Sequence, residues 1–405
     1  MRAKLKKIVI TGMGAVTPLG TGVEEYWKNL SSGVCGLGEI AKLDTSNLPI
    51  HRAGEVRDFH PGDFMPKALV LDTEPFARYA YAAAIEAVAQ SGLDTRVSAA
   101  GVVMGTALHG IDYIARVQRE FDESGKTAEP KLLTKYMGNI TASQFAIHFG
   151  MHGPSMTVST ACSTGGDAVN IASMLLETGR AEAVVVMAGE AAVCPAVIQS
   201  LSKIKAMSPT GESRPFCADR NGFVIGEGGG ALVLETEEHA LKRGAAVLAR
   251  LLGCANNTDG YHPVSPHPEG RGAAECIRLA LKSAGISPEQ VGYVNAHGTA
   301  TIKGDAAEAA AIRSVFGEYS VPVSSTKGAT GHMMAAGGVT EVIACVKAVQ
   351  TGVLPPNLGL TERGQEEGFA LDLVTEENQR RAVSAAISNA MGFGGQNSCV
   401  VVGRY

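Results

Sequence analysis

The stretch STACSTGG, residues 159–166, follows a short apolar segment at residues 155–158 and opens an Ala- and Leu-rich segment that runs to Thr178. This order predicts a strand, a tight turn of small residues and a helix, with Cys162 in the turn. A thiol there faces the positive end of the helix dipole and the free N–H groups of the first turn. We therefore expect a lowered pKa for Cys162 and a nucleophilic thiolate. The plainer alternative is a buried cysteine in a small-residue turn.

Short apolar runs bounded by glycine, of the kind that form buried strands, recur along the chain. They lie at residues 7–11, 101–104, 183–187, 230–234, 292–295, 321–324, 383–387 and 398–402. Ala-rich segments typical of helices lie between them, at residues 76–91, 165–178, 272–284 and 305–316. The alternation predicts an α/β protein with helices packed on sheets. A segment near residues 236–250 is interpreted as the link between two halves, 1–245 and 246–405.

Composition excludes several classes of protein. No apolar run reaches the ~18–20 residues that would span a bilayer, and the basic residues 1–7 lead into a short strand and not into a secretory signal. A cytoplasmic protein is therefore expected. The net charge of −5 over 405 residues does not favour nucleic-acid binding. None of the eight cysteines forms a Cys-x-x-Cys pair, so neither a metal site nor a disulfide framework is predicted.

A second loop after a predicted strand carries a histidine. His297 lies in NAHGTAT, residues 295–301, at the end of a strand where α/β folds place ligands. A structural histidine is the alternative. Asp305 and Glu308 follow on the next predicted helix, and their spacing places them on one face.

A third loop, SSTKGATGH at residues 324–332, carries both Lys327 and His332. A solvated lysine and a capping histidine are the alternatives to a catalytic role. Glu341, further along the helix that follows, is positioned to pair with Lys327.

A fourth segment, NAMGFGGQN at residues 389–397, places Phe393 between glycines. Because glycine gives the backbone a freedom that a packed aromatic ring does not need, the pattern suggests a mobile gate or backbone N–H groups directed at an oxyanion. A plain turn between strands is the alternative. Taken together, the four loops supply a cysteine, two histidines and a lysine, which is typical of a covalent-catalysis site assembled from several strands.

This set of motifs resembles the β-ketoacyl-[acyl carrier protein] synthases of the class with a Cys-His-His site, which have the thiolase fold. Further matching blocks are VITGMG at residues 9–14, RPF at residues 214–216, DRNGFVIGEG at residues 219–228 and DGYH at residues 259–262. The resemblance implies two similar α/β halves in a five-layered αβαβα arrangement. It also implies a homodimer, or a heterodimer with a related subunit.

The resemblance assigns the catalytic roles. Cys162 would take the acyl group from the phosphopantetheine of an acyl carrier protein, and no other cofactor is implied. The backbone N–H groups of Cys162 and Phe393 would form the oxyanion hole, and Phe393 would gate entry of the malonyl group. His297 and His332 would stabilise the enolate that forms as CO2 leaves. The product would be a β-ketoacyl carrier protein.

Supporting roles follow in the same way. Lys327 would hold the electrostatics of the site together with Glu341, Thr299 and Thr301 would hold the pantetheine arm, and Leu108 would line the acyl pocket. The length and saturation of the acyl chain are left open.

Some positions differ from the fatty-acid type. Val70 and Leu71 occupy positions where that type has arginines that help to dock the carrier, Val264 replaces a threonine, and Cys217 replaces an acidic residue. The loop at residues 207–213 is also shorter. We interpret these differences as pointing to a specialised pathway, such as polyketide or polyene assembly, with a dedicated carrier or partner subunit.

Three other interpretations fit the sequence less well. A dinucleotide enzyme would use Gly12 and Gly14, but Thr17 and Pro18 stand where the third glycine is needed. A thiolase would carry a second catalytic cysteine in the last glycine-rich motif, whereas Cys399 lies beyond that motif. A non-catalytic partner subunit that sets chain length would lack Cys162, although the chain could be the active half of such a heterodimer.

Overall fold

The computed structural model describes residues 6–96, 99–361 and 363–405, so the basic residues 1–5 lie outside it. The strands of the first half are β1 (Ile8–Thr17), β5 (Gly101–Gly105), β6 (Ser155–Val158), β7 (Ala183–Ala191) and β8 (Glu227–Thr236), with short pieces β2 (Gly20–Thr21), β3 (Gly38–Glu39) and β4 (Arg52–Ala53). The strands of the second half are β9 (Ala249–Thr258), β10 (Val291–Asn295), β11 (Pro322–Ser324), β12 (Asp372–Leu373), β13 (Ala385–Gly392) and β14 (Gln396–Gly403).

The helices of the first half are α1 (Val23–Ser31), α2 (Lys67–Leu71), α3 (Pro75–Ser91), α4 (Ile111–Ser124), α5 (Leu132–Tyr136), α6 (Gly138–Phe149), α7 (Thr164–Glu177), α8 (Pro195–Lys203) and α9 (Glu237–Lys242). The helices of the second half are α10 (Arg271–Ala284), α11 (Ile302–Phe316), α12 (Lys327–Thr330) and α13 (Met334–Thr351). No described helix combines the length and the apolar character needed to cross a membrane.

The two halves repeat one strand order. In the first half β1, β8 and β7 pair antiparallel, and β7, β5 and β6 pair parallel. In the second half β9, β14 and β13 pair antiparallel, and β13, β10 and β11 pair parallel. The two sets join where residues 8–10 of β1 pair with residues 249–251 of β9. The repeat matches the similar halves that the resemblance implies.

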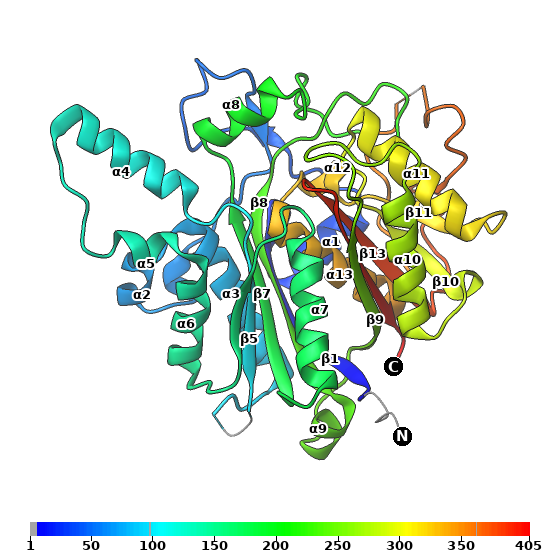
Figure 1. Cartoon of the computed structure of the whole chain (residues 1–405), viewed down its shortest axis with the longest axis horizontal. Helices are drawn as coiled ribbons and strands as arrows, with labels where there is room; N and C mark the ends of the chain where they lie inside the picture. The colour runs from blue at the N-terminus through cyan, green and yellow to red at the C-terminus, as the bar shows by residue number, and fades with distance from the viewer. Residues whose placement is uncertain (1–5, 97–98, 362) are drawn as a thin grey trace.

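Helices cover both faces of each set of strands (Figure 1). α3 packs on the outer face of β1, β8 and β7, while α10 packs on the outer face of β9 and β14. α7 and α13 lie between the two sets and contact strands of both. α13 is buried around its whole circumference, as a helix of a central layer must be. These layers give the α/β, thiolase-like αβαβα architecture.

The extent of β1 differs from the sequence prediction. The strand does not end near residue 11 but continues to Thr17, paired with β8 along most of its length. The Cβ that any other residue would add at Gly12 or Gly14 would meet the carbonyl oxygens of Ala87 or Ala83 on α3. These glycines therefore serve the close packing of α3 on β1, and the segment forms no phosphate-binding turn.

The helices of the central layer meet backbone to backbone. A Cβ added at Gly338 of α13 would lie 2.8 Å from the nitrogen of Gly166 and 2.9 Å from the Cα of Gly165, both on α7. A Cβ added at Gly165 would lie 2.4 Å from the carbonyl oxygen of Ala335. Because α7 follows Cys162 and α13 follows His332, this contact sets the distance between the two loops that precede these helices.

We expect Gly338→Ala to lower the free energy of unfolding by about 1–3 kcal/mol, because the methyl group forces two packed backbones apart. Gly337→Ala is the matched control on the same helix, since its Cβ would meet only a Glu341 oxygen at 3.6 Å. That variant should be neutral or slightly stabilising, because alanine favours the helix. Urea denaturation of both variants measures the difference, and equal unfolding midpoints would contradict this account of the helix contact.

Candidate active site

A network of hydroxyl groups fixes the turn that carries Cys162. Ala161 adopts a left-handed backbone conformation, with φ of 51°, which costs free energy for a residue other than glycine. Thr164 donates its hydroxyl to the Ala161 carbonyl oxygen at 2.6 Å and accepts the N–H of Thr160 at 2.8 Å. The hydroxyl of Ser163 bonds the Thr160 carbonyl oxygen at 2.8 Å. The small polar residues around the cysteine thus hold a strained turn at the start of α7.

The environment of the Cys162 thiol corrects one expectation. Burial raises the pKa of the thiol to about 11, whereas the sequence predicted a lowered value. The charge of Lys327 and the backbone N–H of Phe393 act in the lowering direction, but burial outweighs them. The thiol of the unliganded protein is therefore protonated at neutral pH, and the same two groups are positioned to stabilise negative charge as it develops.

His297 and His332 lie together although they come from different loops. Their ring centroids are 5.4 Å apart at an interplanar angle of 86°. Glu308 fixes the first loop by accepting the backbone N–H groups of His297 and Gly298, each at 2.7 Å. The backbone of His332 pairs with residues 224–226 of the first half, so both halves contribute to its position.

Both imidazoles are held in the neutral form. Burial lowers the pKa of His297 and of His332 well below the usual value, and the positive charge of Lys327 lowers each further. A neutral imidazole carries one N–H and is a hydrogen-bond donor that does not compete for a proton at neutral pH. The pair therefore suits the stabilisation of an oxyanion or enolate.

Lys327 and Glu341 form a buried ion pair, and the charge of Lys327 acts on both histidines. The Lys327 Nζ lies 2.5 Å from Glu341 Oε1, and both side chains are almost fully buried. Asp305 is also buried, but it accepts the backbone N–H of Phe216 at 2.6 Å and lies 3.7 Å from the Arg220 guanidinium. Lys327, Glu341, Asp305 and Glu308 support the site from outside the cavity that the histidines line.

The hairpin between β13 and β14 closes over the thiol. A Cβ added at Gly392 would lie 2.9 Å from the Thr160 carbonyl oxygen and 3.2 Å from the nitrogen of Cys162, so only glycine permits this approach. Gly394 and Gly395 take positive φ values of 90° and 74° at the tip of the hairpin. The turn thereby brings the Phe393 backbone N–H to the sulfur of Cys162.

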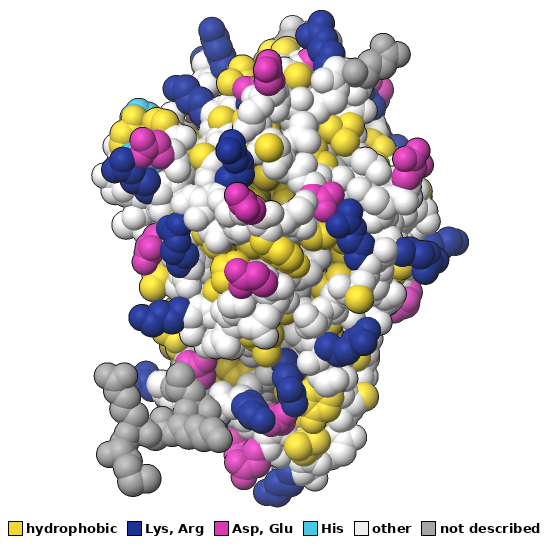
Figure 2. All heavy atoms as spheres, turned by 90° about the vertical axis from the view of Figure 1, so that its right-hand side faces the viewer, with side chains coloured by type: hydrophobic (Ala, Val, Ile, Leu, Met, Phe, Trp, Pro, Cys, Tyr) yellow, Lys and Arg dark blue, Asp and Glu magenta, His cyan; other side chains and the backbone are white. Residues whose placement is uncertain are grey.

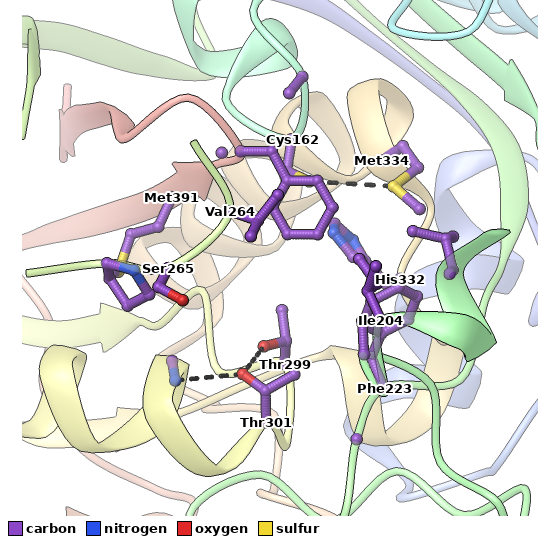
Figure 3. Close-up of a pocket in the computed structure, with 18 of the residues that line it drawn as sticks. Cys162, Ile204, Phe223, Val264, Ser265, Thr299, Thr301, His332, Met334 and Met391 are labelled. Carbon is purple, nitrogen blue, oxygen red and sulfur yellow. Dashed lines mark hydrogen bonds between the residues drawn. The ribbon is translucent and has the colours of Figure 1, made fainter. Parts of the chain in front are cut away.

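These groups surround one cavity of about 760 Å³ (Figure 3). Cys162, His297, His332 and Phe393 line it together. Leu108 lines an apolar lobe beside the thiol, and the other members of that lobe are Ile111, Val197, Leu201, Phe223 and Met334. Thr299 and Thr301 lie on the opposite side, with their hydroxyl oxygens 3.0 Å apart. Seven of the predicted residues thus line one cavity, whereas Lys327, Glu341, Asp305 and Glu308 lie outside its lining.

The positions that depart from the fatty-acid type lie near the surface or away from the thiol. Leu71 of α2 is 60% exposed, and Val264 is exposed where it lines the cavity. Cys217 is buried away from the cavity, 2.9 Å from Asp219 and 3.1 Å from Thr361. Lys and Arg side chains alternate with Asp and Glu over the face shown in Figure 2, so this face presents no single basic patch.

Three residues of the site were not singled out from sequence. The Met334 sulfur lies 3.9 Å from the Cys162 sulfur, and the Phe223 ring meets the His332 ring edge to face at 5.2 Å. Glu190, at the end of β7, is buried close enough to the thiol for its charge to act on the pKa of Cys162. The only signal for Glu190 in the sequence is an acidic residue that directly follows a buried apolar run.

Comparisons with known proteins identify the family of both halves of the chain. Residues 5–240 match the family described as "Beta-ketoacyl synthase, N-terminal domain", and residues 248–361 match its C-terminal domain. A relative from Synechocystis, "3-oxoacyl-[acyl-carrier-protein] synthase 2", is 35% identical over 99% of this chain and 98% of its own. The solved structure "The ishigamide ketosynthase/chain length factor" is 32% identical with a TM-score of 0.94, covering 99% of this chain and 100% of that chain.

A further solved structure, a "type II PKS acyl-carrier protein in complex with its ketosynthase bound to the hexaketide", is 28% identical with a TM-score of 0.90 over 99% of this chain and 100% of that chain. The matches cover both halves, including the loops that carry Cys162, His297 and His332. The chain therefore belongs to the β-ketoacyl synthase family of acyl-transferring condensing enzymes.

Proposed function

We propose that this protein condenses an acyl group held on Cys162 with malonyl-acyl carrier protein, giving a β-ketoacyl carrier protein and CO2. The observation that carries the proposal is the convergence of the thiol, two neutral imidazoles and the Phe393 N–H on one cavity with an apolar lobe. The thiol supplies the nucleophile, and the lobe accommodates a hydrocarbon chain. Each neutral imidazole supplies an N–H that donates a hydrogen bond and keeps its proton at neutral pH.

In the first half-reaction the Cys162 sulfur attacks the thioester carbonyl of the acyl carrier. The new C–S bond forms as the bond to the pantetheine sulfur breaks, and the thiol proton leaves with the pantetheine thiol. In the tetrahedral intermediate between these two events, the backbone N–H groups of Cys162 and Phe393 donate hydrogen bonds to the negatively charged carbonyl oxygen. Thr299 and Thr301 bind the pantetheine arm, and Phe393 at the tip of the hairpin gates the entry of the malonyl group that follows.

In the second half-reaction the bond between the malonyl carboxylate and its neighbouring carbon breaks and releases CO2. The electron pair passes into an enolate, whose oxygen accepts hydrogen bonds from His297 and His332. The enolate carbon then attacks the acyl carbonyl on Cys162, the C–S bond breaks to release the Cys162 thiolate, and the thiolate takes up a proton from water to restore the thiol. Burial keeps both imidazoles neutral throughout, and the charge of Lys327, which is paired with Glu341, adds to this effect.

The pathway that best suits the chain is a specialised one, such as polyketide or polyene assembly. The apolar Val70 and Leu71 on α2 support this proposal, because they remove positive charge that would steer an acidic carrier. The similarity to a ketosynthase/chain length factor structure and to a type II ketosynthase–carrier complex is consistent with a dedicated carrier. Neither step draws on a cofactor beyond the pantetheine of the carrier, and the proposed location is the cytoplasm.

The proposed assembly is a dimer with a second copy or with a related subunit, in which the chain is the catalytic partner. β6 is the last strand on its side of the sheet and pairs only with β5 among the described strands. Met156 on β6 is 40% exposed, and Ile147 on the neighbouring α6 is 80% exposed. A partner that adds to this edge would pair the free backbone groups and cover these apolar side chains.

We expect Cys162→Ala to abolish acyl loading, because the nucleophile is removed. Intact-protein mass spectrometry after mixing with an acyl carrier protein measures the adduct. Cys399→Ala is the control, since Cys399 is a buried residue of β14 and should leave loading unchanged. An adduct of unchanged size in the Cys162 variant would show that another residue is the nucleophile.

We expect His332→Ala to lower the rate of malonyl decarboxylation about 100- to 1,000-fold, because one of the two donors to the enolate is lost. Acyl loading of the same variant should stay within a few-fold of the unaltered protein, which also shows that the variant folds. Release of labelled CO2 from malonyl carrier measures the step, and His152→Ala on the exposed surface is the control. Undiminished CO2 release would remove His332 from the mechanism.

The raised pKa of Cys162 predicts the pH dependence of thiol alkylation. Below a pKa of about 11 the thiolate fraction increases about tenfold for each pH unit, so alkylation by iodoacetamide should keep accelerating between about pH 8 and about pH 10. A mass-spectrometric time course at each pH gives the rate. A plateau already reached near pH 7 would show that the turn stabilises the thiolate more strongly than burial opposes it.

A further inference from the structure

Glu190 is a fully buried carboxyl group that the catalytic steps above do not use. It lies near the end of β7, where successive side chains point to opposite faces of the sheet. Gly189 faces α3 on the outer side, since a Cβ there would meet the Phe76 carbonyl oxygen. Glu190 therefore points inward, toward the central layer and the active-site cavity.

Three consecutive residues donate hydrogen bonds to this carboxylate. Its oxygens accept the backbone N–H of Ala107 at 2.9 Å, the backbone N–H of Leu108 at 3.1 Å and the hydroxyl of Thr106 at 3.4 Å. These three residues form the segment that follows β5. Leu108 is the residue of that segment that lines the apolar lobe.

The same carboxylate reaches the other wall of the lobe. The backbone N–H of Ala335, in the first turn of α13, also bonds to it. α13 has no side-chain cap of its own, so Glu190 serves a group that the helix leaves unpaired. Its neighbour Met334 touches the Cys162 sulfur, and Leu108, Met334 and Cys162 pack in one hydrophobic cluster. The buried Glu190 side chain thus links the two walls of the lobe, which are residues 106–108 and the first turn of α13, beside Cys162.

We propose that Glu190 is a positioning residue that fixes the two walls of the apolar lobe relative to Cys162 and thereby determines how strongly the enzyme discriminates between acyl chains of different length. This inference rests on the proposed loading of acyl groups onto Cys162. Glu190 itself touches neither the substrate carbonyl nor the enolate.

The proposal also predicts a dependence on pH, because the hydrogen bonds of Glu190 change when its carboxyl group is protonated. Burial raises the pKa of the carboxyl to about 7, although the N–H groups of Ala107, Leu108 and Ala335 and the hydroxyl of Thr106 act to lower it. The negative charge of the ionised form in turn acts to raise the pKa of Cys162. A protonated carboxyl accepts more weakly from the three backbone N–H groups, and of its four partners only the Thr106 hydroxyl can accept the new O–H. The walls are therefore held most firmly above about pH 7 and are loosened below it.

The test compares the rates at which butyryl and dodecanoyl carrier proteins acylate Cys162, measured by intact-protein mass spectrometry from about pH 6 to about pH 8.5. The ratio of the two rates cancels the titration of the thiol itself, since both reactions use the same nucleophile. In the unaltered protein we expect the ratio to change around pH 7. In Glu190→Gln we expect it to be constant and the discrimination at high pH to be weaker by about three- to tenfold, the effect of losing one or more hydrogen bonds.

Glu235→Gln is the matched control. Glu235 is an equally buried carboxylate on the adjacent strand β8, but it bonds Thr11, His239 and Arg243 away from the cavity. That variant loses a buried carboxylate and should still keep the ratio and its pH dependence.

A Glu190→Gln variant that keeps both the ratio and its pH dependence would overturn the inference. If that variant does not fold, a ratio in the unaltered protein that stays constant across pH 7 would overturn it equally. Failure of the proposed function looks different, because neither acyl carrier would then give an adduct on the unaltered protein at any pH.

Discussion

The contact between α7 and α13 is the constraint on which the site depends. The two helices belong to different halves, yet their backbones approach so closely at Gly165 and Gly338 that no side chain fits between them. This contact fixes the spacing of the loops that carry Cys162 and His332. The Cys162 thiol and the two imidazoles therefore owe their relative positions to a shared central layer, and neither half holds the complete set of groups.

Burial and the positive charge of Lys327 together shift the pKa values of the groups in the site. Lys327 lies under the cavity with Glu341 as its partner, and its field reaches Cys162, His297 and His332 alike. For the imidazoles the charge and the burial act in the same direction and hold both rings neutral. For the thiol they oppose each other and burial prevails. A single buried cation thus acts on two kinds of group, since it adds to the effect of burial on the imidazoles and opposes the effect of burial on the thiol.

Much of this could be predicted from sequence, because strand-end loops rich in small residues mark where α/β sheets place their chemistry. The segments with Cys162, His297, His332 and Phe393 were found in this way, and the structure brings all four to one cavity. The length of β1 was not predictable, because Gly12 looks like a strand end unless the packing of α3 is known. Nor was the pKa of Cys162, since local sequence reveals the helix N-terminus but not the depth of burial. Glu190 was missed because its partners are backbone groups distant in sequence.

The β13–β14 hairpin has a consequence for folding. β14 lies in the interior of the sheet, between β13 and β9, and β9 precedes it in sequence by most of the second half. Pairing between segments so far apart is slow, because the entropy of a long loop must be lost before any contact forms. Gly392 and Phe393 reach Cys162 only when this strand has inserted. The thiol therefore meets the Phe393 N–H only in a late step of folding, and a chain in which only the first half is ordered lacks one of the two N–H groups of the proposed oxyanion hole.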